Sequence, residues 1–585
     1  MTTKRLGVAA VFALTACAAA ADVAPLDLAA TSVVCPAPTV QLGSMCTLDG
    51  DVTLTHALWL PSGTHLNCRG HKLVPSAVGV EDVQATGGPC VVPQPLTALS
   101  GTCAGSGTKV GLSCTSDVDC MDNEYVPSAP VAGIVVDAAR DVKVENCVLE
   151  GFDFSIVVMD TAAGSPGGSP SVKILGNTIR GRHFGVWLIG ASDALVADNT
   201  ISFESSGSGV TVVRSSRNHV RNNNISRQYD LASRPVIAPP FSPGERTNTL
   251  PGRPFSPGGT VLPVLFNNAI GIIAFGTASA PVVNVVIDGK LKQFPYIPGH
   301  PSIFSADNLI ENNTIDIPWQ NAVLPPQPSV TVFFGLASGD ASRGTIFRGN
   351  TIKRAARAIH LNGMTFGARA TPRRCTGDET RWCSTDDHCA GLGSCPPPDA
   401  PFGVNDDGLV RDGWVEDNVI EGPFRDQGLY AGNAKGTVFR GNTVEARSQA
   451  GAQAALLLQG RGFEDSVVTR NRLTSRVGVR LAQNGAPLPG SNTTRGDSYG
   501  STLSVNDITG WSVAAVQIQG PFAPFHAALT DGARGNYWGL DCPGFDPAQV
   551  KVFNSTVVST DAVDDHPYGQ PVAQAADADL PAPCL

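Results

Sequence analysis

A short phrase of polar and apolar residues recurs along most of this chain: an asparagine, a variable residue and then an aliphatic residue, after a short β-rich run. The asparagines of the ten clear copies are Asn146, Asn177, Asn199, Asn223, Asn313, Asn350, Asn418, Asn442, Asn471 and Asn506, and Asn536 begins a degenerate copy. Several consecutive copies are 22 to 31 residues apart, as from 199 to 223 and from 146 to 177. This period predicts one coil of a parallel β-solenoid, in which neighbouring coils bury each other's apolar residues.

The chemistry of asparagine explains its place in the repeat. Each coil must turn sharply between sheets, and asparagine tolerates the left-handed or bridge conformations that such turns need. Its amide both donates and accepts, so the ten asparagines are predicted to stack as a hydrogen-bonded ladder from coil to coil. The aliphatic residue two positions later is expected to point into the core.

A second phrase follows most of these turns and reads small residue, aliphatic, variable, aliphatic. Its copies occupy residues 185–188, 209–212, 271–274, 358–361, 428–431, 455–458, 478–481 and 515–518. The alternation with period 2 places the aliphatic residues inside and the variable residue outside. Each coil is therefore expected to supply at least two strands. A further copy at 133–136 places the beginning of the solenoid at or before residue 133.

The chain resembles the pectin-lyase-like superfamily, and within it the NosD-like carbohydrate-binding and sugar-hydrolase repeats. SGTHLNCRGHKL (62–73) is similar to the opening strand of that group and GNYWG (535–539) to its closing strand. The resemblance covers about residues 45–570. It implies an all-β fold, a right-handed parallel β-helix, and we expect about 10–13 coils with disulfide-stapled loop insertions between residues 31 and 570.

Three segments do not fit the repeat. Residues 86–128 and 366–405 are rich in cysteine and share a related phrase, CTSDVDC and CSTDDHC, which we interpret as two disulfide-stapled loops. Zinc fits less well because the Cys-x5-Cys spacing exceeds that of common ligand pairs, and calcium is a minor alternative. The calcium ligands would be Asp117, Asp119, Asp386 and Asp387. Residues 232–264, rich in proline and glycine, are predicted to form a surface loop, and the tail 571–585 to be mobile unless Cys584 ties it down.

The N-terminus predicts export. Lys4 and Arg5 precede a short apolar run and small residues, the layout of a signal peptide over residues 1–21. The run is about half of the ~20 residues that cross a bilayer. Leu14-Thr15-Ala16-Cys17 also resembles a bacterial lipobox, so lipidation of Cys17 and ordinary cleavage before Asp22 both stay open. The expected location is the outer membrane or cell surface as a lipoprotein, or the medium as a secreted protein.

Cysteine count and charge agree with export. Without Cys17, 14 of the 15 cysteines remain, an even number that suits disulfides in an oxidising compartment. The net charge is −10, and loss of Lys4 and Arg5 takes it to −12. This balance argues against nucleic acid and anionic membrane surfaces as partners, and leaves a lipid anchor as the only expected membrane contact.

The outward residues of the second phrase form two predicted columns on one sheet, where sugar chemistry usually occurs in the superfamily. Of the 22 positions in these two columns, only Asp137 is acidic. In the coil between Ile273 and His360, the repeat places Thr331 and Phe333 in the columns. Aromatic and amide side chains suit uncharged contacts with sugar rings. The glycan-binding candidates are Trp187, Phe275, Phe333, His360, Asn362, Tyr430 and Gln517. A covering loop, such as 232–264, is the alternative reason for an apolar stripe here.

Catalytic candidates are weaker. Glycoside hydrolysis normally needs two carboxylates about 5–9 Å apart, and these columns lack such a pair. Asp406 and Asp407, in an NDDG phrase, fit a turn better than a polygalacturonase site. Arg180 and His183 could serve a metal-free lyase as a base but also fit an ordinary loop. We expect no cofactor or metal beyond the calcium alternative, since five methionines and ten scattered histidines do not form a copper site.

A third column, two residues before the asparagines, alternates in charge. It contains Arg221, Glu311, Arg348, Glu416 and Arg440. We interpret it as a solvated face with ion pairs between coils and assign it no chemistry.

Three functions are compatible with this sequence. The first is an exported surface protein that binds polysaccharide or cell-wall glycan without catalysis. The second is a polysaccharide lyase, hydrolase or epimerase whose acids come from the insertions, for instance Asp406, Asp407 and Asp426. The third is a structural or adhesive stalk, for which the aromatic column should be covered.

Overall fold

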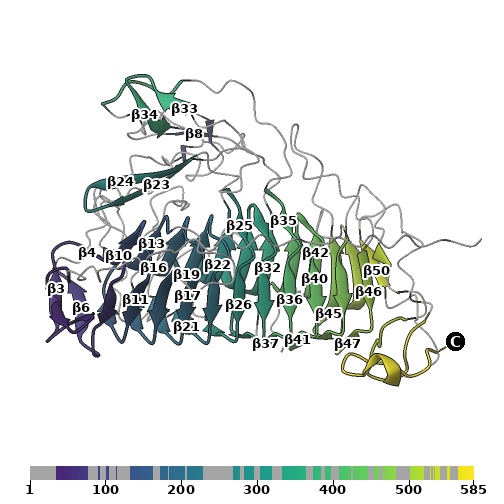
Figure 1. The fold of residues 1–585 in the computed structure, drawn as a ribbon. Coiled ribbons are helices and arrows are strands. Elements are labelled where there is room, and N and C mark those ends of the chain that lie inside the picture. Colours follow the sequence, from purple (N-terminus) through teal and green to yellow (C-terminus); the bar gives the residue numbers. More distant parts are fainter. Residues whose placement is uncertain are drawn as a thin grey trace, which may run out of the picture. The chain divides into compact units, whose positions relative to one another are not determined.

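The solenoid predicted from the repeat is present in the computed structural model of the chain, where strands of successive coils stack along one axis (Figure 1). The structure describes residues 35–76, 90–91, 101–103, 113–114, 132–161, 171–181, 184–203, 207–227, 268–276, 282–295, 303–318, 332–363, 373–383, 389, 391–396, 408–422, 424, 426–445, 454–459, 465–482, 501–519, 527–528, 531, 534–540, 550–553, 564 and 566–584. Within these residues no helix is long and apolar enough to cross a membrane.

Three long sheets, which we name A, B and C, form the walls of the solenoid. Sheet A contains β1 (Val40–Leu42), β2 (Met45–Thr47), β5 (His65–Asn67), β11 (Val142–Glu145), β14 (Val172–Leu175), β17 (Ala194–Ala197), β20 (His219–Arg221), β26 (Leu309–Glu311), β30 (Ile346–Arg348), β36 (Trp414–Glu416), β40 (Val438–Arg440), β43 (Val467–Thr469), β46 (Ser501–Ser504) and β49 (Ala527–Ala528). Sheet B contains β3 (Val52–Leu54), β6 (Lys72–Pro75), β12 (Val148–Glu150), β15 (Thr178–Gly181), β18 (Thr200–Phe203), β21 (Asn224–Arg227), β27 (Thr314–Asp316), β31 (Thr351–Lys353), β37 (Val419–Glu421), β41 (Thr443–Glu445), β44 (Arg472–Thr474) and β47 (Asp507–Thr509). Sheet C contains β4 (Leu58–Trp59), β10 (Ala132–Asp137), β13 (Phe154–Met159), β16 (Phe184–Ile189), β19 (Gly207–Val213), β22 (Asn268–Phe275), β28 (Val332–Gly339), β32 (Arg357–Asn362), β38 (Gln427–Gly432), β42 (Ala454–Gln459), β45 (Val477–Ala482), β48 (Ala514–Gln519) and β50 (Val550–Phe553).

Each coil runs through the sheets in the order C, A, B, and each strand pairs in parallel with the equivalent strand of the next coil. The one antiparallel pair in these sheets joins β1 and β2 at the N-terminal edge. A smaller parallel sheet extends the turn between sheets C and A and contains β25 (Ser305–Ala306), β29 (Ser342–Arg343), β35 (Val410–Arg411) and β39 (Ala434–Lys435). The right-handed parallel β-helix and its expected number of coils are confirmed.

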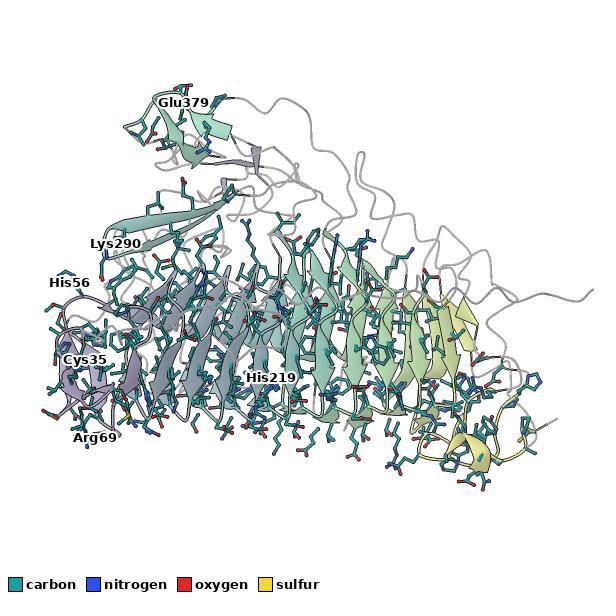
Figure 2. The ribbon with its side chains drawn as sticks, in the orientation of Figure 1. Cys35, His56, Arg69, His219, Lys290 and Glu379 are labelled. Atoms are coloured by element: carbon teal, nitrogen blue, oxygen red, sulfur yellow. A yellow bond between two sulfur atoms is a disulfide. The ribbon has the colours of Figure 1, made fainter. Side chains whose placement is uncertain are left out.

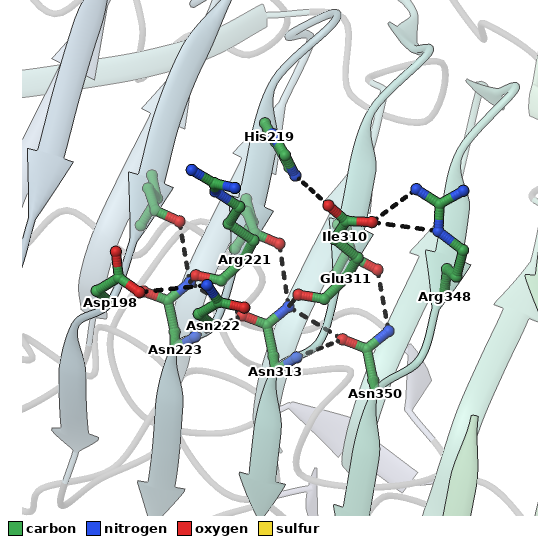
Figure 3. Close-up of polar contacts among 12 residues, drawn as sticks. Asp198, His219, Arg221, Asn222, Asn223, Ile310, Glu311, Asn313, Arg348 and Asn350 are labelled. Atoms are coloured by element: carbon green, nitrogen blue, oxygen red, sulfur yellow. Dashed lines mark hydrogen bonds and ion pairs between the residues drawn. The ribbon is translucent and has the colours of Figure 1, made fainter. Parts of the chain in front are cut away.

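The predicted asparagine ladder lies in the turn between sheets A and B (Figure 3). Asn223 donates from its backbone N–H and from Nδ2 to Oδ1 of Asn313, at 3.0 and 2.9 Å. The same Nδ2 donates to the carbonyl of Val196 in the preceding coil, at 3.0 Å. The pattern repeats with little change at every rung from Asn177 to Asn506, and all the rungs, with Asn536 as the last, are buried. The rungs are Asn177, Asn199, Asn223, Asn313, Asn350, Asn418, Asn442, Asn471, Asn506 and Asn536.

Asn146 was predicted to be a rung and is not one. The backbone N–H of Cys147, not of Asn146, donates to Oδ1 of Asn177, at 2.9 Å. Asn146 stands one position earlier, with φ +54. The error arose because Asn146 and Val148 copy the spacing of the motif, whereas Leu149 is the buried aliphatic residue of this coil.

A left-handed residue precedes each rung from Asn177 to Asn506. Asp198, Asn222, Asn312 and Asp417 have φ between +54 and +60, and none of the ten rungs has a positive φ. Asparagine is therefore selected at the rung for its amide, while the conformation of the turn is carried by the residue before it, where glycine, asparagine and aspartate are the residues that adopt positive φ most readily.

The two ends of the ladder are closed differently. At the N-terminal end a disulfide joins Cys147 to Cys68, in the preceding coil. At the C-terminal end the backbone N–H of Asn536 donates to Oδ2 of Asp564, at 2.8 Å, and Nε1 of Trp538 donates to the same oxygen at 2.8 Å. Burial raises the pKa of Asp564, and these hydrogen bonds partly oppose the rise.

The small residue of the second phrase has a steric cause. A Cβ at Gly271 would lie 2.4 Å from Cγ2 of Ile315 and 2.5 Å from the carbonyl oxygen of Gly335 in the next coil. Gly185, Gly209, Gly335 and Gly478 meet equivalent neighbours. A close approach of sheet B side chains and of the next coil's backbone therefore favours glycine and other small residues at this position.

The alternating charge column lies on the outer face of sheet A and forms the predicted pairs between coils (Figure 3). Arg348 contacts Glu311 at 2.6 Å and Glu416 at 3.7 Å, and Nε2 of His219 lies 2.7 Å from Oε1 of Glu311. Partial burial acts to raise the pKa of Glu311, but the hydrogen bonds from Arg348 and His219 outweigh it and lower the pKa.

The described parts of the cysteine-rich insertions are antiparallel. Residues 86–128 include β7 (Cys90–Val91), β8 (Gly101–Cys103) and β9 (Ser113–Cys114), which form one small sheet. Residues 366–405 include the pair β33 (Arg373–Cys375) and β34 (Asp378–Cys383). A disulfide joins Cys375 to Cys389, and Cys395 is also disulfide-bonded, which confirms the stapling of this second insertion. Asp117, Asp119, Asp386, Asp387 and the 232–264 loop lie outside the described residues.

The tail packs against the end of the solenoid. Cys584 is disulfide-bonded, the condition under which the tail was expected to be held. Oδ1 of Asp507 accepts hydrogen bonds from the backbone N–H groups of Val572 and Ala573, at 2.6 and 3.0 Å. Val572 and Tyr568 are buried beside Val505, and a short 3₁₀ helix, η7 (Asp577–Asp579), follows. Another disulfide, Cys35–Cys46, lies at the opposite end.

Candidate functional site

The outer face of sheet C carries the predicted columns in register. The first column contains Val135, Val157, Trp187, Thr211, Ile273, Ala337, His360, Tyr430, Leu457, Arg480 and Gln517. One coil differs from the prediction: Ala337 and Gly339 stand where Thr331 and Phe333 were expected. Phe333 instead pairs with Ala269 near the beginning of β28, because the coil's small residue is Gly335. The candidate Phe333 is therefore outside both columns.

A β-hairpin covers the N-terminal half of this face (Figure 1). Its strands are β23 (Val282–Ile287) and β24 (Lys290–Pro295), joined at Asp288 and Gly289, both with positive φ. Val285, Ile287 and Phe294 are buried against residues of both predicted outward columns of sheet C, on strands β10 to β19. Trp187 and Phe275 pack against the same cluster and keep only partial exposure. Trp187 and Phe275 therefore follow the alternative in which a covering segment explains the apolar stripe, and the covering segment is this hairpin.

Polar contacts hold the edges of the hairpin, whose second strand begins at Lys290 (Figure 2). Lys292 contacts Asp137 and, at 3.0 Å, Asp160. Asp288 accepts hydrogen bonds from Nε1 of Trp59 at 2.9 Å and from the backbone N–H of Ala57 at 3.0 Å. Burial acts to lower the pKa of Lys292, and the two carboxylates outweigh it and raise the pKa. Asp137, the one acid of the columns, is thus already paired with a cation.

Past the hairpin, three rings stack across three coils. The ring centroids of Phe334 and His360 are 4.1 Å apart, and those of His360 and Tyr430 are 4.3 Å apart. The guanidinium of Arg357 lies 5.6 Å from both the Phe334 and Tyr430 rings, and its Nε donates to Asp426 at 3.2 Å. The three stacked side chains are 6 to 7% exposed. His360 and Tyr430 are therefore brought together as predicted but are buried rather than open to solvent.

Burial fixes the charge of this stack. It lowers the pKa of His360 well below its usual value, with a smaller contribution from Arg357. It raises the pKa of Tyr430 to about 12, against a smaller opposing effect of Arg357. Both rings are consequently neutral at pH 7. Nδ1 of His360 has no hydrogen-bond partner among the described residues.

Tyr430 is directed along its own strand by a glycine. A Cβ at Gly432 would lie 2.3 Å from the Tyr430 hydroxyl oxygen and 2.8 Å from Cζ of the ring. The hydroxyl donates to Oε1 of Gln459 in the next coil, at 3.0 Å. The ring thus lies over Gly432 and connects the buried stack to a half-exposed amide.

Four half-buried polar side chains lie on the outer face of sheet C between β32 and β48, and we call them the polar strip. They are Asn362 on β32, Gln459 on β42, Arg480 on β45 and Gln517 on β48. Nε of Arg480 donates to Oε1 of Gln517, at 2.5 Å. Burial lowers the pKa of Arg480. The strip offers amide donors and acceptors beside a guanidinium.

Arg357 and Phe334 were missed from the sequence because they precede the small residue of their coils. At that point of each strand the alternation breaks: the small residue and the aliphatic residue after it both face the interior. The preceding side chain therefore returns to the outer face, as Phe154 and Phe184 show by stacking with Trp187. A bulky residue directly before the small one would have been the signal.

The catalytic candidates do not converge on this face. Arg180 lies on β15 of sheet B, where Nη1 donates to Glu150 at 2.5 Å. His183, Asp406 and Asp407 lie outside the described residues. Asp426, at the entrance to β38, is paired with Arg357. In the described part of the chain no group of three or more His, Cys, Asp or Glu side chains could hold a metal ion.

Part of the chain is similar to a known protein family. Residues 100–231 match the family model described as periplasmic copper-binding protein (NosD), in agreement with the NosD-like resemblance of the sequence. No curated protein sequence matches the chain. The described residues do not supply the cluster of ligands that the copper in that description would require, so we assign no copper chemistry to them.

Solved structures with the same type of fold include the tailspike protein of E. coli bacteriophage HK620 in complex with a pentasaccharide, with 11% identity and a TM-score of 0.37. The match covers 88% of this chain and 73% of the tailspike chain. PfbA, a surface adhesin of Streptococcus pneumoniae, has 10% identity and a TM-score of 0.30, and the match covers 83% of this chain and 86% of PfbA. These are similarities of fold.

Proposed function

We propose that this chain is an exported β-helix protein that binds polysaccharide or cell-wall glycan on the C-terminal half of sheet C. One observation carries the proposal: the register places the amides of Asn362, Gln459 and Gln517 and the guanidinium of Arg480 along one half-buried face. Amides donate and accept at the same time, which suits the hydroxyl groups of sugars. Half-burial also restricts these side chains before a ligand arrives, which lowers the entropic cost of binding.

We propose binding rather than cleavage because the described carboxylates on this face are already paired with cations. Hydrolysis normally needs one acid to protonate the leaving group and a second to act as base or nucleophile. Of the described acids on this face, Asp137, Asp160 and Asp426 are each paired with a cation. Acids near the 366–405 insertion, such as Asp406 and Asp407, would support the alternative of a lyase, hydrolase or epimerase.

Export is supported by the disulfides. Cys35–Cys46, Cys68–Cys147 and Cys375–Cys389 are formed, and disulfides persist mainly in oxidising compartments. The signal peptide over 1–21 and lipidation at Cys17 stay predictions, to be checked by mass spectrometry of the mature N-terminus.

The test is affinity electrophoresis of the full chain through a panel of embedded glycans, followed by titration calorimetry with the best ligand. The double variant Gln459→Ala and Gln517→Ala should weaken binding by about tenfold, since two hydrogen-bonding groups of roughly 0.5–1.5 kcal/mol each are lost. The matched control, Asn224→Ala and Thr314→Ala, alters two exposed side chains on neighbouring strands of sheet B and should change nothing. Equal weakening by both variants would contradict the proposal.

Two further results would select an alternative. New reducing ends or unsaturated products during incubation would establish cleavage and favour the enzyme. Absence of binding to every glycan would favour the structural or adhesive stalk. The observation behind the stalk is the hairpin, which covers Trp187 and Phe275.

A further inference from the structure

Arg480 is the part of the polar strip that the proposed function leaves unexplained. It stands on β45, in register between Leu457 of β42 and Gln517 of β48. Leu457 is buried, and Ala482, two residues along the same strand, is buried as well. Arg480 therefore stands beside an apolar part of sheet C.

No carboxylate compensates this charge among the described residues. The polar contact of Arg480 there is the single hydrogen bond from Nε to Gln517, although a guanidinium carries five N–H donors. Arg357, the other cation of this half of the face, has its partner in Asp426. Half-burial of a cation beside a neutral amide is unfavourable unless something else supplies the negative charge.

The register brings a further basic residue beside Gln517. The residue in register with Gln517 on the next strand, β50, is Lys551. Gln517 thus stands between two basic positions, Arg480 and Lys551. The acid that precedes β38, Asp426, is two coils before Arg480.

We infer that the polar strip selects acidic saccharides, with Arg480 binding a sugar carboxylate and Gln459 and Gln517 binding the adjacent hydroxyl groups. This rests on the proposed function and adds the class of ligand. A guanidinium is planar and presents parallel N–H donors that match the two oxygens of a carboxylate. Formation of this pair supplies Arg480 with an anion that the described residues do not provide.

The experiment uses an oligouronate and the same oligosaccharide after reduction of its carboxyl groups to alcohols, so that the two ligands differ only in the acid. Calorimetry with the full chain should show about 10- to 100-fold tighter binding of the oligouronate, the range expected for hydrogen bonds to a charged group. Arg480→Gln should remove this preference and keep the affinity for the reduced ligand. Arg480→Lys, which keeps the charge without the planar fork, should retain part of the preference.

Arg440→Gln is the matched control, because Arg440 is an exposed arginine on sheet A. Circular dichroism and the melting temperature establish that each variant is folded. Equal affinity of the wild type for both ligands, or an unchanged preference in Arg480→Gln, overturns this inference and leaves glycan binding intact. Tighter binding of an oligosaccharide that carries sulfate groups and no carboxyl groups than of the oligouronate overturns the assignment to a carboxylate. Failure of every ligand to bind removes the proposed function as well.

Discussion

A rung of the ladder is one side chain with several hydrogen bonds. Oδ1 of Asn350 accepts from both the backbone N–H and Nδ2 of Asn313, and its own Nδ2 donates to Asn418 and to the carbonyl of Ile310. Aspartate cannot donate, and serine is too short to supply both groups. This requirement explains why asparagine recurs so regularly, and it made most rungs predictable from the sequence.

His360 illustrates a residue whose chemistry depends on its neighbours in space. Its position in the column was predicted correctly, but the ring is buried between Phe334 and Tyr430. The sequence did not reveal this, because Phe334 reaches the outer face only through the break in alternation before Gly335. Burial of outer-face residues depends on what covers the sheet, which strand periodicity does not encode.

His360 should make the protein less stable in mild acid. Because burial lowers its pKa in the folded state, the unfolded chain takes up a proton near the ordinary value of about 6.5 while the folded chain does not. As the pH falls from 7 to 5, the unfolded state is therefore favoured, by at most about 1.4 kcal/mol per pH unit. The stacked neighbours do not titrate in this range, since the pKa of Tyr430 is about 12.

The measurement is the melting temperature of the wild type and of His360→Phe between pH 7 and pH 5. Phenylalanine keeps a flat ring between Phe334 and Tyr430 and cannot be protonated. The variant should lose less stability on acidification than the wild type. Parallel curves for the two proteins would show that His360 is not the group responsible.

At the scale of elements, the glycine position of sheet C determines how closely strands approach. Gly271 faces Ile315 of β27 and the backbone of β28 at distances that exclude a Cβ. Gly271→Ala should lower the free energy of unfolding by about 1–3 kcal/mol, because the close-packed interior must shift. Gly50→Ala is the control, since nothing lies within 4 Å of a Cβ there.

Chemical denaturation followed by circular dichroism checks this prediction. The midpoint should fall in Gly271→Ala and stay within error in Gly50→Ala. An unchanged midpoint in Gly271→Ala would mean that the coil relaxes without cost, and the recurrence of small residues would then need another cause.

The strands were predictable wherever both phrases were intact, because period-2 alternation and a fixed turn specify each coil. The prediction failed at β28, where Val332 and Phe333 extend the apolar run ahead of the true small residue, Gly335. It also omitted the hairpin β23–β24, although Asp288-Gly289 between two alternating runs is a strong hairpin signal. Its docking site on sheet C required the structure, since the contacts join residues more than 200 positions apart, such as Trp59 and Asp288.

For the whole molecule, a solenoid is stabilised chiefly by contacts between neighbouring coils, so exposed ends are its weak points. In this chain the asparagine ladder ends at the disulfide between Cys68 and Cys147 on one side and at the carboxylate of Asp564 on the other, and the disulfide Cys35–Cys46 lies at the N-terminal edge. The tail reinforces the C-terminal end through Asp507. The sequence predicted only that the tail would be held if Cys584 formed a disulfide, and it did not reveal the contacts with Asp507.

Asp564→Ala should therefore loosen the molecule from one end. The substitution leaves the buried N–H of Asn536 and Nε1 of Trp538 without their acceptor, a cost of about 1–3 kcal/mol for each group. Because each coil is stabilised by the next, amide protection should fall most in β46 and β47, less in β43 and β44, and remain unchanged in β14 and β15. Hydrogen exchange followed by mass spectrometry measures this gradient peptide by peptide.

Asp564→Asn, which retains an oxygen acceptor, should lose much less protection. A uniform loss along the chain would show instead that the solenoid unfolds as one cooperative unit, in which the closure of a single end matters to every coil equally.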